Sequence, residues 1–261
     1  MATQAATKYS RISMEFDTPV ARVTLNNPPL NIIDISMMEE LFNALTEIEA
    51  RSDISVVIMS GSQKAFSAGV DIAAHIPDQI EQMLTKFHAV IRSIISSTKV
   101  SIAAVHGRCL GGGAELAMVC DLVYTSELAT WGFPEIKLGC FPPVAVTVLP
   151  ALVGQKQAAD LVLTGRSITG REAATIGLAN AVVPEVDLEH TLQQAVHHLT
   201  QLSPAALAVT KKAIYAWDSI HFDKGLARAE KIYFDELMKT QDAQEGITAF
   251  LEKRQPVWRG K

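Results

Sequence analysis

The feature that most constrains the fold of this 261-residue chain is a regular alternation of short apolar runs with amphipathic segments. The apolar runs at 56–60, Val100–Val105 and 122–125 have the length and composition of buried strands. Amphipathic helical patterns lie between them, at 79–95 and 112–119. Strands that alternate with helices in this way build parallel sheets covered by helices. The sequence therefore predicts a layered α/β domain with largely parallel sheets.

Two further strands and a helix are predicted near the N-terminus. The segments 12–16 and Val20–Leu25 flank a turn at 17–19, so we expect them to pair as antiparallel strands. A helix should follow, with Ser36 as its N-cap and Glu39 completing a capping box.

The pattern changes after about residue 184, where strand-like runs stop. Four helices are predicted beyond this point, at 188–202, 204–217, 222–239 and 243–252. We therefore divide the chain into an α/β core at 1–184 and a helical C-terminal region at 185–261. The amphipathic faces of these helices suggest that the C-terminal region serves oligomerisation.

Charge and composition argue against several classes of protein. The formal net charge is −5 with both signs well mixed, so there is no basic stripe for nucleic acid. No apolar run reaches the roughly 20 residues of a membrane span, and residues 1–10 lack the apolar segment of a secretory signal. Cys109, Cys120 and Cys140 have no paired or metal-ligand spacing, which is typical of core-filling thiols in a reducing compartment. We expect a cytoplasmic protein without nucleic-acid or membrane partners.

A glycine-rich stretch at 106–116 is the first candidate for chemistry. A predicted strand ends near His106, and Gly111, Gly112 and Gly113 precede a helix-forming run. Backbone N–H groups at a helix N-terminus lack intrahelical partners, and glycine lets a ligand approach them closely. The stretch could therefore cradle an oxyanion or a phosphate, or it could simply let the helix pack tightly. It matches neither a dinucleotide fingerprint nor a P-loop, and the chain has no G-x-S-x-G nucleophile elbow.

Two glutamates accompany this stretch. Glu115 lies in the first helical turn after the glycines, where a carboxylate also favours the helix dipole. Glu135 follows an apolar strand twenty residues later. Two carboxylates near one backbone cradle suit paired acid–base work. No metal or redox cofactor is indicated.

These residues resemble the crotonase, or enoyl-CoA hydratase/isomerase, family. Its two loop patterns, Phe-x-Ala-Gly-x-Asp and Gly-x-x-x-Gly-Gly-Gly-x-Glu-Leu, are complete here at 66–71 and 107–116, and the segment 245–254 is similar to the family's C-terminal end. The resemblance implies a crotonase-type spiral of β-β-α units with a C-terminal helical region. It also implies homotrimers, often paired as homohexamers.

The resemblance assigns roles by matching position. The backbone N–H groups of Val70 and Gly112 would form an oxyanion hole. Coenzyme A would enter only as part of an acyl-CoA thioester substrate and would contact Ala68, Asp71 and Ile72. Because family hydratases keep two carboxylates, matching Glu115 and Glu135, and many isomerases work with one, the resemblance favours a hydratase.

One departure from the family pattern concerns the turn after the second glutamate. Typical hydratases have a glycine-rich turn here, whereas this chain has Cys140 followed by Phe141, Pro142 and Pro143. Two prolines make the turn stiffer, and we expect the last three residues to lie beside the acyl group.

This variant resembles hydratases of cyclic dienoyl-CoA thioesters in anaerobic aromatic degradation, which implies cyclohexa-1,5-diene-1-carbonyl-CoA as substrate. The alternatives are an ordinary short-chain enoyl-CoA hydratase, an enoyl-CoA isomerase, and a non-catalytic subunit that binds CoA esters.

Overall fold

The structure is a computed structural model that describes residues 9–75 and 78–260, without the side chains of 216–221. Residues 1–8 lie outside the described part, so the prediction that residues 1–10 are not a secretory signal falls mostly on residues that the structure does not describe. Ten strands are present in the described part: β1 Ile12–Asp17, β2 Val20–Leu25, β3 Val56–Gly61, β4 Ala65–Ser67, β5 Val100–Val105, β6 Arg108–Leu110, β7 Leu122–Ser126, β8 Thr130–Gly132, β9 Ser167–Thr169 and β10 Ala181–Val183.

Helices alternate with these strands, as the sequence predicts. The α-helices are α1 Ile35–Ala50, α2 Ile80–Ser96, α3 Gly112–Met118, α4 Pro143–Val153, α5 Gln155–Thr164, α6 Gly170–Thr175, α7 Leu188–Thr200, α8 Pro204–Asp235 and α9 Gln241–Leu251. Short 3-10 helices are η1 Ile72–His75, η2 Pro134–Leu138, η3 Glu185–Asp187 and η4 Leu237–Lys239.

The strands form two sheets. The larger has the order β1-β2-β3-β5-β7-β10, and all its neighbours are parallel except the predicted antiparallel pair β1 and β2. The smaller has the order β4-β6-β8-β9. Along the chain, a strand of the larger sheet, a short strand of the smaller sheet and a helix recur as β3-β4-α2, β5-β6-α3 and β7-β8-α4. The prediction of an α/β domain with largely parallel sheets is confirmed.

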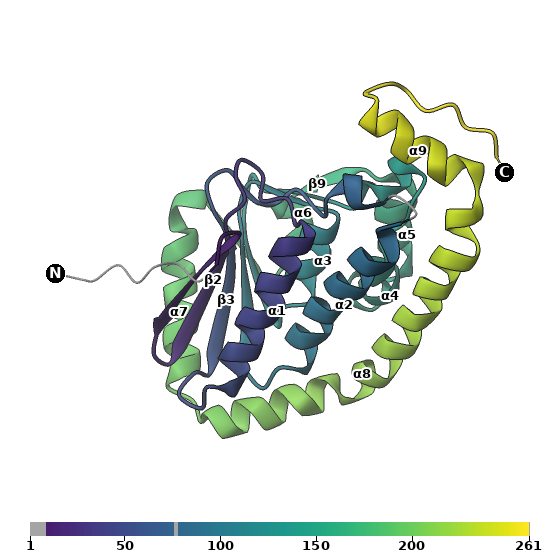
Figure 1. Cartoon of the computed structure of the whole chain (residues 1–261). Coiled ribbons are helices and arrows are strands. Elements are labelled where there is room, and N and C mark those ends of the chain that lie inside the picture. Colours follow the sequence, from purple (N-terminus) through teal and green to yellow (C-terminus); the bar gives the residue numbers. More distant parts are fainter. Residues whose placement is uncertain (1–8, 76–77, 261) are drawn as a thin grey trace.

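The central strands β3 and β5 of the larger sheet are buried on both faces, which explains their continuous apolar sequences. Val57 and Met59 of β3 face the main core under α1, α2 and α3. Val56 and Ile58 of the same strand face a second cluster that includes Leu188 of α7. Figure 1 shows α7 on the opposite side of the sheet from α1 and α2. Residues 56–59 alternate between the two apolar layers, so a polar side chain without a hydrogen-bond partner would be costly at any of these four positions.

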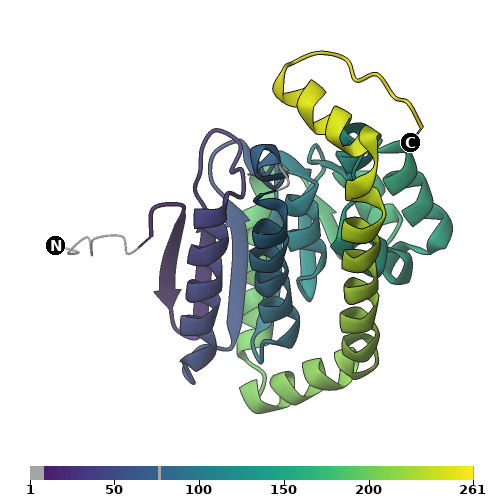
Figure 2. The ribbon, with the colours of Figure 1, turned by 45° about the vertical axis from the view of Figure 1, so that its right-hand side comes forward.

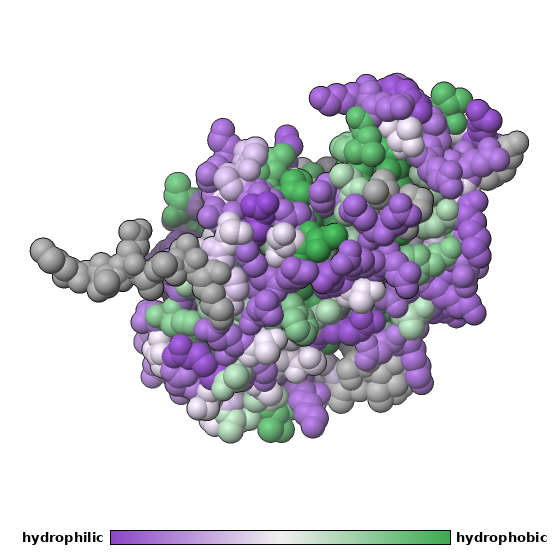
Figure 3. Space-filling view, in the orientation of Figure 1, coloured by the Kyte–Doolittle hydropathy of each residue, from purple (hydrophilic) through white to green (hydrophobic). Residues whose placement is uncertain are grey.

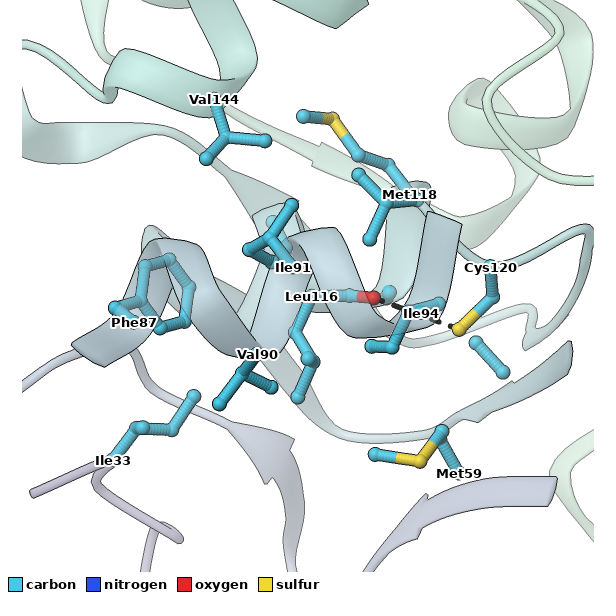
Figure 4. Packing of buried hydrophobic residues seen from close by; sticks show 14 of the residues in the cluster. Ile33, Met59, Phe87, Val90, Ile91, Ile94, Leu116, Met118, Cys120 and Val144 are labelled. Carbon is cyan, nitrogen blue, oxygen red and sulfur yellow. Dashed lines mark hydrogen bonds between the residues drawn. The ribbon is translucent and has the colours of Figure 1, made fainter. Parts of the chain in front are cut away.

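The main core also holds the three cysteines. Cys109, Cys120 and Cys140 are free and buried, as predicted for core-filling thiols. Figure 4 shows Cys120 beside Leu116 of α3, whose carbonyl oxygen accepts a hydrogen bond from the Cys120 thiol at 3.6 Å. The same view shows the side chains of α2 packed against Leu116. Helix α3, which carries Glu115, is thus buried within the core.

The C-terminal helices wrap around this core. Figure 2 shows α8 rising along one side of the molecule to α9 at the top, and Figure 3 shows apolar residues gathered where α9 meets the body of the molecule. Pro204 begins α8, as its fixed φ favours. Among the helices that the structure describes, none is both long and apolar enough to cross a bilayer.

Two local predictions were wrong. The N-cap of α1 is Asp34 rather than Ser36, because the Asp34 carboxylate accepts the Met37 N–H at 2.8 Å. Glu39 does not close a capping box and pairs instead with Lys86, 2.8 Å away on α2. The two helices predicted at 204–217 and 222–239 form one helix, α8, because no proline or glycine lies between them to end it.

Candidate active site

The second glycine of the 111–113 run presents a free backbone N–H. Gly111 has a φ of +52°, a conformation that glycine adopts without strain, and its own N–H donates to the Gly132 carbonyl oxygen at 2.9 Å. Gly112 begins α3, and within the described part of the chain its N–H makes no hydrogen bond. The third glycine serves packing, since a Cβ on Gly113 would lie 2.7 Å from the Ser67 carbonyl oxygen.

A second free N–H comes from the loop after β4. The Ile33 N–H donates to the Gly69 carbonyl oxygen, and the Asp71 N–H donates to the Ile33 carbonyl oxygen, at 2.9 and 3.1 Å. The intervening Val70 N–H points away from this pairing and has no partner among the described residues. A Cβ added to Gly112 would lie 3.4 Å from the Val70 nitrogen, so the two free N–H groups lie close together.

This loop is held in place by buried polar groups. The Ser67 hydroxyl donates to the Asn31 carbonyl oxygen at 2.7 Å and accepts from the Gly69 N–H at 3.1 Å. The Asn31 amide in turn donates to the Ala65 carbonyl oxygen at 2.8 Å. Ser67 and Asn31 are both fully buried. The Val70 N–H is therefore positioned before any ligand arrives, which is what makes such donors effective.

Glu115 connects α3 to the start of α4. Its side chain is 3% exposed, and its Oε1 accepts the Ala145 N–H at 2.8 Å. Burial raises the pKa of the Glu115 carboxyl to about 7, against the opposing effect of the Ala145 and Val144 N–H groups. The sequence could not show this contact, because it joins residues from two separate units of the fold.

Glu135 lies in η2 opposite the glycine run. A Cβ on Gly111 would lie 2.6 Å from Glu135 Oε1, so a larger residue at this position would force the carboxyl to shift. Glu135 Oε2 is enclosed and has no hydrogen-bond partner among the described residues. Burial, and then the charge of Glu115, raise the pKa of Glu135 to about 8. An enclosed carboxyl oxygen without a partner is costly, and such groups are found where a ligand or water completes them.

Both carboxyls face one small cavity of about 70 Å³, which we call the carboxylate cavity. It brings together nine of the ten residues proposed from the sequence: Ala68, Val70, Ile72, Gly112, Glu115, Glu135, Phe141, Pro142 and Pro143. The 140–143 turn therefore lies beside the carboxylates, although it is separated from the glycine loops along the chain.

Asp71 is the candidate that does not line this cavity. Its Oδ1 accepts the Ala73 N–H at 3.0 Å at the entrance to η1. Its carbonyl oxygen lies 3.1 Å from His75 Nδ1. In this structure Asp71 shapes the turn after the first loop.

Several lining residues were not predicted. Phe87 and Met83 come from α2, His75 from η1 and Tyr233 from α8. Tyr233 is 1% exposed, and its burial raises the pKa of the phenol. In the sequence each of these residues resembles an ordinary core position, so no local signal distinguishes them.

The arrangement can stabilise a developing oxyanion and move a proton. Two free N–H donors suit a carbonyl oxygen that gains negative charge. Two close carboxyls titrate as a pair, and because both pKa values are raised, the Glu115 and Glu135 pair retains a proton at neutral pH. One acid and one base are then available together. The described residues contain no cluster of three or more His, Cys, Asp or Glu that could hold a metal ion.

Comparisons with known proteins extend over nearly the whole sequence. The model of the enoyl-CoA hydratase/isomerase family matches residues 15–261. The chain is 34% identical over 251 residues to the cyclohexa-1,5-dienecarbonyl-CoA hydratase of Thauera aromatica, which covers 96% of this chain and 97% of that protein. It is 36% identical over 251 residues to a probable enoyl-CoA hydratase of Mycobacterium bovis, with 95% and 97% covered. The fold matches an enoyl-CoA hydratase from Mycobacterium avium subsp. paratuberculosis with a TM-score of 0.87 at 26% identity, over 96% and 99% of the two chains.

Proposed function

The chain belongs to the enoyl-CoA hydratase/isomerase family and is a hydro-lyase of the enoyl-CoA hydratase type, and from this premise we propose that Glu115 and Glu135 add water to an α,β-unsaturated acyl-CoA thioester. The observation that carries this proposal is the pair of buried carboxyls facing one cavity beside two free N–H groups.

The chemistry follows from this arrangement. When water attacks the β-carbon, negative charge develops on the thioester carbonyl oxygen. The N–H groups of Val70 and Gly112 would donate hydrogen bonds to that oxygen, and these bonds would be stronger in the transition state than in the ground state. The carboxyl pair would hold the attacking water, take its proton and deliver a proton to the α-carbon. Coenzyme A enters only as part of the substrate, and the proposal requires no further cofactor.

We propose a compact cyclic acyl group, that of cyclohexa-1,5-diene-1-carbonyl-CoA, as the substrate. Two observations support this choice. The stiff 140–143 turn places Phe141, Pro142 and Pro143 against the carboxylate cavity, which is small. The relative from Thauera aromatica is named for this reaction and is 34% identical.

An ordinary short-chain enoyl-CoA hydratase is the second candidate. Its support is the 36% identity to a protein named as a probable enoyl-CoA hydratase. Mass spectrometry after separate incubation with crotonyl-CoA and the cyclic diene thioester distinguishes the two, because each hydration adds the mass of one water. Water gained by the cyclic diene alone would support the cyclic substrate, and water gained by crotonyl-CoA alone would support the second candidate. If neither gained water, the hydratase proposal would fail.

The proposal also covers the oligomeric state of the enzyme, its location in the cell and the pathway in which it works. We expect a homotrimer or homohexamer built with the 185–261 region, working in the cytoplasm in the degradation of aromatic compounds. Light scattering coupled to size-exclusion chromatography tests the first point, since a monomer in solution would contradict it.

A further inference from the structure

A second and larger cavity lies next to the carboxylate cavity. It has a volume of about 610 Å³ and lies between α4, α8 and the end of α3. Most of its lining is apolar, including Ile95, Met118, Val146, Ala151, Ala229 and Ile232. We call it the apolar cavity. Nothing in the proposed chemistry uses it.

Phe141 lines both cavities and therefore lies at their boundary. Its ring packs edge-on against Tyr233, with ring centroids 5.1 Å apart and planes at 74°. Tyr233 lines the carboxylate cavity but not the apolar one, so the pair forms a wall with Tyr233 on the inner side.

This wall is rigid on both sides. Tyr233 is 1% exposed and also contacts Phe234 edge-on, with centroids 5.9 Å apart. The Cys140 N–H donates to the Glu135 carbonyl oxygen at 3.0 Å, and prolines 142 and 143 fix the backbone that follows Phe141. The backbone that carries Phe141 therefore has little freedom to move the ring away from Tyr233.

We propose that Phe141, braced by Tyr233, determines the length of acyl group that the enzyme accepts. This inference rests on the proposed function. A thioester with its carbonyl at the Val70 and Gly112 N–H groups has only the remaining space of the carboxylate cavity for its acyl atoms. A compact acyl group stops at the Phe141 ring, whereas a longer straight chain must cross it. Without that ring, the apolar cavity would receive the chain.

The test is the variant Phe141→Ala with straight-chain trans-2-enoyl-CoA substrates of increasing length. In the wild type, kcat/KM should be lowest for the longest straight chains, and if only the cyclic diene is hydrated, the wild-type value for every straight chain is the detection limit of the assay. In the variant, the ratio of long-chain to short-chain kcat/KM should rise, by about fourfold for each methylene that enters the apolar cavity. Because both substrates are measured on one preparation, this ratio is independent of the fraction of protein that folds.

A second variant locates the path of the chain. Ala229 lines the apolar cavity from α8, and Ala229→Phe should fill part of it. Adding Ala229→Phe to Phe141→Ala should cancel the gain for long chains. A gain that persists in the double variant would overturn the inference, as would an unchanged ratio in Phe141→Ala.

The outcomes also separate this inference from the proposed function. A wild-type enzyme that hydrates enoyl-CoA substrates, combined with an unchanged ratio in Phe141→Ala, overturns the inference alone. A wild type that hydrates none of the straight chains and not the cyclic diene overturns both.

Discussion

The two cavities beside Phe141 differ in the polarity of the groups that line them. The carboxylate cavity contains groups that burial disfavours: two carboxyls with raised pKa values, an enclosed Glu135 Oε2 without a partner, and the free N–H groups of Val70 and Gly112. The apolar cavity is lined mostly by aliphatic side chains, whose removal from water is favourable. The contrast shows that this fold places its buried polar groups together in one cavity. Proteins tolerate such energetically unfavourable groups at sites of binding or catalysis.

The glycines differ in the same way. Around the carboxylate cavity, Gly69 and Gly111 have φ values of +109° and +52°, and these conformations direct the backbone toward the cavity. Beside the apolar cavity, Gly225 lies within α8, where a Cβ would meet the Thr147 Cγ2 atom at 2.7 Å. The first pair serves a special backbone geometry, and the last serves close helix packing.

The strongest test of this contrast removes the charge of one carboxyl. Glu115→Gln or Glu135→Gln should each lower kcat by roughly 10²–10⁴-fold, because proton transfer in the transition state contributes about that much. Binding of the saturated analogue butyryl-CoA should persist, as measured by calorimetry. The matched control is Glu81→Gln, at an exposed position of α2, which should leave kcat unchanged. If one of the two variants retained full activity, the carboxyls would not act as a pair.

A second test fills the space beside the free N–H groups. Gly112→Ala places a methyl 3.4 Å from the Val70 nitrogen, so we expect kcat/KM to fall about 10²-fold with both glutamates intact. Gly154→Ala is the control, because Gly154 has a φ of +80° but nothing within 4 Å of an added Cβ. With a ψ of 151° as well, Gly154 has a backbone conformation that is essentially restricted to glycine, so this variant should lower stability by about 1–3 kcal/mol. It should leave kcat/KM unchanged. Equal activity losses in the two variants would indicate a general effect on folding.

A third test measures how much the burial of the ionised Glu115 carboxylate lowers the free energy of unfolding. Since its folded pKa is about 7 and the ordinary value is 4.5, the folded chain binds more protons than the unfolded chain between these values. Stability from this group is therefore present below about pH 4.5 and is lost as the pH rises through 7. Glu115→Gln keeps an oxygen for the Ala145 N–H and removes the charge, so at pH 8 it should be more stable than the wild type by about 3 kcal/mol.

Urea unfolding at pH 5 and pH 8 measures this effect. The difference between variant and wild type should widen toward pH 8. A difference that narrows with rising pH would mean that burial of Glu115 carries no such cost.

The smallest effect is expected at Asp71, the candidate outside the carboxylate cavity. Asp71→Asn keeps an oxygen that can accept the Ala73 N–H, so kcat should change by less than about threefold. Steady-state kinetics with the best substrate provide the measurement. A loss of kcat as large as that of the glutamate variants would mean that Asp71 takes part in catalysis, although it does not line the carboxylate cavity.

The fold was predictable where the sequence pattern is long. The continuous apolar runs of β3 and β5 could be recognised because both faces of the sheet are buried. The three-residue strands of the smaller sheet could not, since three residues show no periodicity. The N-cap of α1 was misplaced at Ser36 because Asp34 and Ser36 are both good capping residues, and only the tertiary pairing of Ile33 with Val70 selects the earlier one.

The candidate site was predictable to the extent that its residues occur in motifs. The glycine loops and both glutamates were identified, and the cavity contains them. Tyr233 and Phe87 were missed because an aromatic residue on an amphipathic helix looks the same whether it faces a core or a cavity. Their place depends on how α8 and α2 pack, which no local pattern records.

The hydrogen bonds at the two ends of the 140–143 turn limit how this enzyme can change over evolutionary time. At one end, the Cys140 N–H donates a hydrogen bond to the Glu135 carbonyl oxygen. Just beyond the other end, the Ala145 N–H donates a hydrogen bond to the Glu115 carboxylate. A residue inserted into or deleted from the turn would therefore displace both Glu115 and Glu135. New substrates are therefore accessible by exchanging side chains such as Phe141, while the length of the turn is inherited together with the activity.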